Sequence, residues 1–401
     1  MKNIKAAGTI IAVALLVLTF TAQPVAAASR YDSLFAFIND SYDSVEGGYA
    51  YYEEATSRSD ASFAAVGILT EWGILDDRPP VINITRLKQL TYKLHWRTGA
   101  EDTDRYGGFS NYIAGPVTQR TTFDVINILD ILDNPEHQDV ININDPSIQV
   151  NFTAVLVWLN KTQTTSGGFG SEPKKPADIV STYYALTSMR YALDASDDAD
   201  ETWDKWLMNR TATIEFILNA RDGDAFKLTP SSHVASVTAT AAAVLALNVL
   251  EETSELGGLQ PIVNWVTERQ TTASDSELAG GFEEGILTND TNLITTYWAL
   301  ALLDTVNALA GVDEAGAARF IVNCQAENGA FAIVPDAREG LLYTAYQAVH
   351  SLGILGEEYR NLIYEGDPNN PSPILIDWKL AVVIGIVLVA AVLAVIALRY
   401  D

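Results

Sequence analysis

The chain has 401 residues, of which 51 are acidic and 25 are basic, so its net charge is −26. Acidity of this strength argues against nucleic acid and against an anionic membrane surface as partners. The single cysteine, Cys324, excludes an intramolecular disulfide framework.

Residues 1–28 predict a secretory signal peptide. Lys2 and Lys5 precede the apolar segment Ile10–Phe20, and the small residues Ala26–Ala28 offer a cleavage site. The short apolar segment favours cleavage over retention as an anchor helix. We therefore expect the rest of the chain to be exported.

Six copies of one unit follow the signal. Each copy has an amphipathic segment, a tight turn with an aromatic residue, a polar loop and a strongly apolar segment. The turn aromatics are spaced 60, 60, 57, 56 and 49 residues apart, and this regularity indicates a repeat architecture. The six turns are Gly47-Gly48-Tyr49, Gly107-Gly108-Phe109, Gly167-Gly168-Phe169, Asp224-Ala225-Phe226, Gly280-Gly281-Phe282 and Gly329-Ala330-Phe331.

The segments on either side of each turn predict two kinds of helix. In the third copy Val150, Ala154 and Trp158 recur at helical spacing, as one buried face requires. Segments after the turns, such as Ala239–Leu250, lack a polar face, so both of their sides must be buried. The pattern predicts an all-α fold, an (α/α)6 toroid with inner helices ringed by outer ones; an open solenoid is the alternative. The predicted outer helices are 32–42, 86–96, 148–163, 211–221, 260–270 and 315–325.

The third copy carries a resemblance to a known family. Its Gly-Gly-Phe turn, its loop with lysine and proline, Asp178 and the string STYYAL from Ser181 resemble the prenyltransferase and squalene-oxidase repeat. The resemblance covers roughly 31–355 and implies the toroid of protein prenyltransferase β subunits and terpenoid cyclases. It is more specific for the fold than for an activity, because one fold supports many functions.

The resemblance also allows a test for zinc chemistry. Protein prenyltransferases hold zinc with an Asp, a Cys two residues later and a His in a later repeat. The matching positions here are Asp178, Val180 and Tyr343. Valine cannot bind zinc and tyrosine replaces imidazole poorly. We therefore expect no zinc and no cofactor, and we expect Asp178 to cap the helix that follows it.

Other catalytic patterns are missing from the sequence. The acid strings of terpenoid cyclases, DxDD and DDxxD, and the thioester string GCGEQ do not occur. We expect His350, on an apolar helix, to be a core histidine. A carbohydrate-active toroid would need two facing carboxylates, for which the mouth candidates are Asp178, Asp290 and Glu339. The four histidines, none at metal-pair spacing, are His95, His137, His233 and His350.

The loops between the turns and the inner helices should gather at one mouth of the toroid. Inner-helix starts would present positive dipole ends and free N–H groups there. A basic mouth over an aromatic well would suit an amphipathic anion or a peptide; alternatively, the aromatics are ordinary packing and the charges are solvated. The basic candidates are Arg120, Lys174, Lys175, Lys227, His233 and Arg338, and the aromatic ones are Phe123, Tyr183, Tyr184, Tyr297, Trp298, Tyr343 and Tyr346.

The exported part also has an acidic loop and several N-x-[ST] sequons. The acidic loop Asp194–Asp204 has carboxylates that could bind Ca²⁺, but it lacks the glycine and terminal glutamate of an EF-hand loop, so a solvated linker is expected. We expect Asn151, in another N-x-[ST] sequon, to face the core. The sequons predicted as glycosylation acceptors are Asn39, Asn83, Asn160, Asn209 and Asn289.

The C-terminal part predicts a membrane anchor. Residues 356–378 are rich in proline and asparagine and predict a stalk. Leu380–Leu398 provides nineteen uncharged apolar residues, enough to cross a bilayer, so we place a transmembrane helix at 379–398 and a cytoplasmic tail at 399–401. The toroid, 29–355, would lie outside the cell.

We expect a cell-surface module that binds a ligand or a protein through its mouth; the alternative is an enzyme of prenyltransferase, terpenoid-cyclase or carbohydrate-active type.

Overall fold

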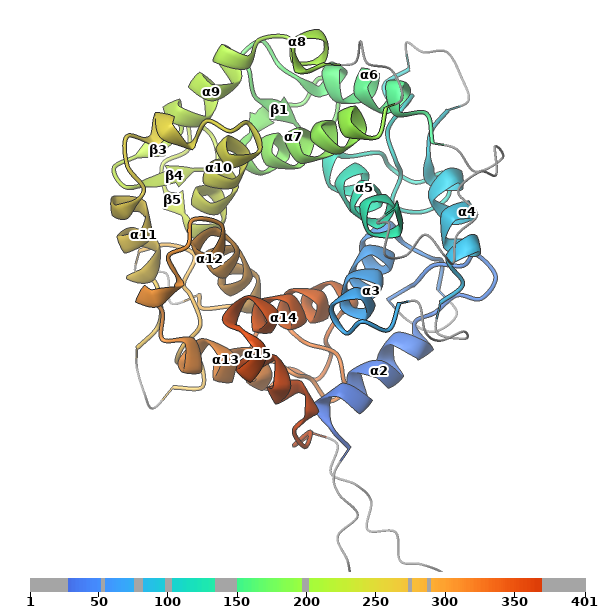
Figure 1. Cartoon of the computed structure of the whole chain (residues 1–401), viewed down its shortest axis with the longest axis vertical. Coiled ribbons are helices and arrows are strands. Elements are labelled where there is room, and N and C mark those ends of the chain that lie inside the picture. Colours follow the sequence, from blue (N-terminus) through green and yellow to red (C-terminus); the bar gives the residue numbers. More distant parts are fainter. Residues whose placement is uncertain are drawn as a thin grey trace, which may run out of the picture.

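Two concentric rings of helices form where the sequence alternates between half-polar and fully apolar segments (Figure 1). The computed structural model describes residues 28–51, 55–75, 82–97, 103–133, 150–196, 202–272, 276–286 and 290–369. The outer helices are α2 (Arg30–Asp40), α4 (Ile84–Leu94), α6 (Phe152–Thr162), α9 (Arg210–Asn219), α11 (Gln260–Thr267) and α13 (Glu314–Asn323). The inner helices are α3 (Ser59–Glu71), α5 (Gln119–Asp133), α7 (Ile179–Asp194), α10 (Val237–Val249), α12 (Leu293–Thr305) and α14 (Leu342–Leu355).

Short elements join the two rings. Antiparallel strands, which the sequence did not predict, link some turns to the inner helices. β1 (Phe169–Gly170) pairs with β2 (Ala177–Asp178). In the next repeat the middle strand of three is β4 (Ala225–Lys227), which pairs with β3 (Arg221–Asp222) and with β5 (Ala235–Ser236). The remaining elements are α8 (Trp203–Trp206), α15 (Glu357–Arg360) and the 3-10 turns Thr253–Leu256, Leu309–Gly311 and Asn361–Tyr364.

One hydrogen bond explains why a hydroxyl residue recurs in the inner helices. The Phe169 ring is fully buried, and its backbone N–H donates to Thr182 Oγ1 at 3.0 Å. A buried N–H without such an acceptor would be costly. Four other copies use the same bond: Tyr49 to Ser62, Phe109 to Thr122, Phe226 to Thr240 and Phe282 to Thr296.

The first glycine of a turn lets successive repeats pack closely. Gly167 has a φ of 93°, and a Cβ there would lie 2.2 Å from the carbonyl oxygen of Ala212 in the next outer helix. Gly329, in the last turn, has a φ of 84° and a Cβ position 2.5 Å from the carbonyl oxygen of Ser33 in α2. The sixth repeat therefore packs on the first as the third packs on the fourth.

A glutamine after the outer helix also contacts the next repeat in the same way at both places. Gln163 donates from Nε2 to the Gly167 carbonyl and to Thr213 Oγ1 in α9. Gln325 donates from Nε2 to the Gly329 carbonyl and to the Arg30 carbonyl at the start of α2. The helices form a closed ring, so the toroid prediction is confirmed and the open solenoid is wrong.

The ring closure also involves the C-terminal segment. The Arg30 N–H donates to the Glu365 carbonyl at 2.9 Å, and the Asp367 N–H donates to the Ala28 carbonyl at 2.8 Å. The first part of the predicted stalk, through residue 369, thus packs on the toroid instead of leaving it. No helix in the described ranges is long and apolar enough to cross a membrane. The predicted span at 379–398 lies outside them, as does most of the predicted signal peptide.

The sequons occupy several structural positions. Asn83, Asn151 and Asn209 are N-caps of α4, α6 and α9, so helix capping gives these asparagines a structural role. Asn151 is exposed, so the expectation that it faces the core was wrong. The Asn160 side chain donates to the Trp206 carbonyl, and Asn39 is exposed. Asn289 lies outside the described residues.

The close approach at the ring seam can be tested with Gly329→Ala. The added methyl group should collide with the α2 backbone and lower the free energy of unfolding by about 2–4 kcal/mol. Gly257→Ala is the matched control, because Gly257 also has positive φ, at 67°, but a Cβ there has no neighbour within 4 Å. The control should lose only about 1 kcal/mol in urea denaturation. Equal losses in the two variants would show that the seam tolerates the methyl group.

Candidate functional site

The loops at the mouth close over the starts of the inner helices. The N–H of Ile179, at the start of α7, donates to the carbonyl of Leu228 in the next repeat at 2.9 Å. The N–H of Leu293 donates in the same way to the carbonyl of Ile333 at 2.8 Å. The expectation of free N–H groups at these positions was therefore wrong, because neighbouring loops already use them.

Most of the predicted basic residues lie on the outside of these loops. Lys174 is 79% exposed and pairs with Asp104 at 2.9 Å, and Lys175, His233 and Arg338 are exposed. None of these lines the central cavity described below. The same loops also carry the acidic residues Glu172, Glu283, Glu284, Asp290, Asp336 and Glu339. The mouth is thus mixed in charge, and the prediction of a basic mouth was wrong.

Exposed apolar side chains also gather on the mouth loops. They occur in the second, fourth, fifth and sixth repeats, between the turn aromatic and the following inner helix. Each belongs to a loop that covers an inner-helix start, and we call these side chains the apolar rim. The rim consists of Tyr112, Ile113, Leu228, Val234, Ile286, Ile333 and Val334.

A cavity of about 240 Å³ runs between the inner helices. Its lining on α14 extends from Tyr343 to Ile354, which corresponds to about 16 Å along a helix axis. A cavity of this volume that extends over this length must be narrow. All seven predicted aromatics line it, and the complete lining is Phe63, Phe123, Asn127, Tyr183, Tyr184, Leu245, Tyr297, Trp298, Ala301, Asp304, Thr305, Tyr343, Tyr346, His350 and Ile354.

The aromatic residues both pack together and line the cavity. The Phe123 and Tyr184 rings lie 4.6 Å apart between centroids, and Tyr183 meets Trp298 edge-on at 5.7 Å. Burial raises the pKa of Tyr183 to about 12, so its phenol keeps its proton. The two interpretations of these aromatics are therefore compatible, since the packed rings form a stiff apolar wall with a few hydroxyl groups.

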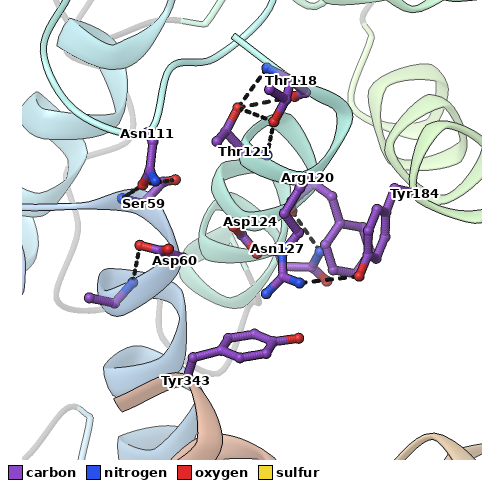
Figure 2. A network of polar contacts seen from close by, with 12 residues as sticks. Ser59, Asp60, Asn111, Thr118, Arg120, Thr121, Asp124, Asn127, Tyr184 and Tyr343 are labelled. Atoms are coloured by element: carbon purple, nitrogen blue, oxygen red, sulfur yellow. Dashed lines mark hydrogen bonds and ion pairs between the residues drawn. The ribbon is translucent and has the colours of Figure 1, made fainter. Parts of the chain in front are cut away.

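Arg120 is the one predicted basic residue that contacts the cavity wall. Its Nε donates to Asp124 Oδ1 at 2.8 Å, and its Nη1 donates to the Tyr184 hydroxyl at 3.2 Å (Figure 2). The guanidinium carbon lies 4.0 Å from the ring centroid of Tyr343. Arg120 therefore joins α5, α7 and α14 at the mouth end of the cavity, with 31% of its side chain exposed.

Asp124 is fully buried beside this arginine. Its Oδ2 has no hydrogen-bond partner among the described residues. Burial raises the pKa of Asp124 to about 6, although the adjacent Arg120 acts to lower it, and the charge of Asp60 adds to the rise. Asp60 itself is held by Arg58 at 3.2 Å and by the Tyr51 hydroxyl at 2.5 Å.

The histidines differ in their surroundings. His95 is a buried core residue stacked on Phe109, and burial lowers its pKa to about 4. His350 instead lines the cavity at the end away from the mouth, with its Nδ1 2.7 Å from Glu71 Oε1. The expectation that His350 is a core histidine was therefore wrong.

The positions matched to zinc ligands do not fit a zinc ion. Asp178 caps α7, because its carboxylate accepts from the N–H and the hydroxyl of Ser181, as expected. Tyr343 packs on Arg120, and Val180 offers no donor atom. In the ranges that the structure describes, no three His, Cys, Asp or Glu side chains are grouped as a metal site requires.

The carboxylates proposed for carbohydrate chemistry do not meet in the cavity. Asp178, Asp290 and Glu339 are absent from its lining. The acidic residue in the lining is instead Asp304, near the C-terminal end of α12. Asp124 and Glu71 lie behind the wall, beside Arg120 and His350. Sequence analysis missed all three. A charged residue in the apolar helix around Phe123, four positions after Arg120, was the available signal for Asp124. Nothing local indicated that Glu71 faces a histidine 279 residues later.

Comparisons with known proteins agree with this architecture. Residues 10–222 and 209–378 match the sequence model of the prenyltransferase alpha-alpha toroid domain. No curated protein sequence matches the chain.

Three solved structures resemble the chain over most of their length. They are the Candida albicans protein geranylgeranyltransferase-I complexed with GGPP (16% identity, TM-score 0.58, 84% of this chain and 96% of that one), a glycosidase (10%, 0.54, 83% and 96%) and a variant of the Scytonema type II terpene cyclase MstE complexed with geranylgeranyl dihydroxybenzoate (13%, 0.51, 83% and 97%). At these identities the similarity shows the fold alone.

The raised pKa of Asp124 predicts a specific pH dependence of stability. Below about pH 4 the carboxyl is protonated in both the folded and the unfolded chain. Between pH 4 and pH 7 the unfolded chain ionises first, so this group's contribution to stability is lost as the pH rises. The free energy of unfolding of Asp124→Asn, measured relative to that of wild type, should therefore rise by up to about 3 kcal/mol between pH 4 and pH 7. Urea denaturation at both pH values measures it, and a constant difference would mean that Asp124 ionises normally.

Proposed function

Because this chain belongs to the prenyltransferase alpha-alpha toroid family, we propose that it binds a small molecule with a long, apolar body and a polar, anionic end in its central cavity. The observation that carries the proposal is the narrow aromatic cavity, with Arg120 packed on two of its lining residues, Tyr184 and Tyr343, at the mouth end. The cavity volume is slightly below the range of about 300–1,000 Å³ for drug-sized ligands, so a slender ligand fits best.

Two of the structural neighbours support this ligand class. The geranylgeranyltransferase was solved with GGPP and the cyclase with geranylgeranyl dihydroxybenzoate, and both compounds join an isoprenoid chain to a polar group. The aromatic walls here would contact such an apolar chain. The Arg120 guanidinium would donate to the polar end, as in other charge-assisted hydrogen bonds. The apolar rim would also contact the apolar part of such a ligand as it enters the mouth.

The other candidate functions have less support. A prenyltransferase or terpenoid-cyclase activity would need catalytic groups other than the absent zinc ligands and acid strings. A carbohydrate-active toroid would need a carboxylate pair other than the three predicted at the mouth. Recognition of a protein partner is the second candidate, and the apolar rim favours it, because clustered exposed apolar side chains mark interaction surfaces.

The ligand proposal is tested with decanoate, a slender anion, and decanol, its uncharged counterpart. Asp124→Asn keeps Arg120, and Asp124→Asn with Arg120→Met removes the cation without leaving a buried, unpaired carboxylate. Losing one charge-assisted hydrogen bond, about 1.5–3 kcal/mol, should weaken decanoate binding about 10- to 100-fold in calorimetry. Decanol affinity should stay the same in both variants.

Equal decanoate affinity in the two variants would show that Arg120 does not bind the carboxylate of the ligand. If neither compound binds to wild type or to either variant, the ligand proposal fails and recognition of a protein by the apolar rim becomes the better one.

We also propose that the toroid lies outside the cell as a glycoprotein, tethered by residues 379–398. The signal-like N-terminus, the apolar C-terminal segment and the exposed sequons Asn39, Asn83 and Asn209 support this location. A membrane-impermeant amine reagent added to intact cells should label Lys174 and Lys175, which are exposed. Labelling only after lysis would contradict the proposed location.

A further inference from the structure

The end of the cavity away from the mouth carries a second polar group. Glu71, the last residue of α3, accepts hydrogen bonds on both carboxylate oxygens. His350 Nδ1 lies 2.7 Å from Oε1, and Arg360 Nη2 donates to Oε2 at 3.3 Å. Since α3 belongs to the first repeat and α14 to the last, this cluster exists only because the ring closes.

Glu71 determines which nitrogen of His350 carries a proton. Burial acts to raise the pKa of Glu71, but the hydrogen bond from His350 and the charge of Arg360 hold it below its usual range. The carboxylate is therefore charged and can only accept hydrogen bonds. His350 Nδ1 must then be the donor, which leaves the lone pair of the neutral imidazole on Nε2.

The rest of the imidazole faces the cavity. His350 is among its lining residues, and 33% of its side chain is accessible. Its ring stacks on Tyr346 at 5.5 Å and lies 5.9 Å from Tyr297, both of which also line the cavity. No described residue hydrogen-bonds to Nε2. His95, by contrast, is 4% exposed and stacks on Phe109, as a packing histidine would.

We propose that His350 is a proton acceptor for a hydroxyl group at the far end of a ligand in this cavity. The proposal rests on the proposed function in one respect, namely that a ligand enters the cavity. In the proton-transfer step the ligand O–H bond breaks and an N–H bond forms at Nε2. The products are an oxyanion, which is a stronger nucleophile, and an imidazolium whose positive charge is stabilised by the Glu71 carboxylate.

The two ends of the cavity then select a specific ligand class. Arg120 would hold an anionic or polar end near the mouth, the aromatic walls would contact the apolar body, and His350 would accept from a hydroxyl at the other end. Aliphatic or aromatic hydroxy acids have this chemistry.

The protonated nitrogen of His350 can be read directly by NMR. In full-length protein labelled with ¹⁵N-histidine at pH 8, two-bond ¹⁵N–¹H correlations distinguish the two neutral tautomers. We expect the Nδ1–H form for His350, with its signals identified by their loss in His350→Gln. Glu71→Leu should shift it to the Nε2–H form, because the acceptor for Nδ1 is gone. Glu71→Gln keeps an acceptor and should retain the Nδ1–H form.

Access to Nε2 is measured with diethylpyrocarbonate, which reacts with neutral imidazole, followed by peptide mass mapping. His233, which is exposed, and His95, which is buried, are internal references. We expect His350 to be modified together with His233 while His95 is spared. An Nε2–H tautomer in wild type, or the absence of modification at His350, would overturn the proposal.

Neither measurement needs a bound ligand, so the result does not depend on the proposed function. Protection of His350 by decanoate would report only on ligand binding. If His350 shows the expected tautomer and reactivity but decanoate and decanol do not bind, the Nε2 lone pair and its access are established, whereas the ligand proposal fails and proton transfer from such a ligand fails with it.

Discussion

The contact between the sixth turn and the first outer helix is the interaction on which the rest of the structure depends. Gly329 approaches the Ser33 carbonyl, and Gln325 donates to the Arg30 carbonyl. An open array of the same repeats would expose the apolar sides of its terminal inner helices. Closure buries those sides and creates a central cavity, which no single repeat contains.

Closure also assembles chemistry from distant parts of the chain. Arg120 of the second repeat meets Tyr343 of the sixth, and Glu71 of the first meets His350 of the sixth. Buried charged pairs of the Arg120–Asp124 type contribute little net stability, because desolvation offsets their attraction. A packed apolar pair would serve stability equally well, so the stability of the fold does not by itself require the charges at this end of the cavity.

The residues that build the family's fold differ from the residues that would carry its zinc chemistry, and this chain keeps only the first set. The toroid uses the turn glycines, the buried aromatics and the hydroxyls that accept from them, and these are present in most copies. The zinc chemistry of protein prenyltransferases needs a thiolate and an imidazole, where this chain has Val180 and Tyr343. One architecture can therefore persist while the chemistry in its centre changes.

The sequence by itself determined the repeat and the two kinds of helix. It also predicted the toroid and the aromatic lining, with an open solenoid and ordinary aromatic packing as the alternatives that the structure then decided. These follow from local rules: periodicity, the conformational freedom of glycine, and the need to bury helices without a polar face. Asp178 as a helix cap was predictable for the same reason. Only the tertiary structure decided that Lys174 pairs with Asp104 away from the cavity, that Asp124 is buried and that His350 faces Glu71. Those facts depend on the distances between residues tens to hundreds of positions apart, which closure of the ring sets and which no local pattern records.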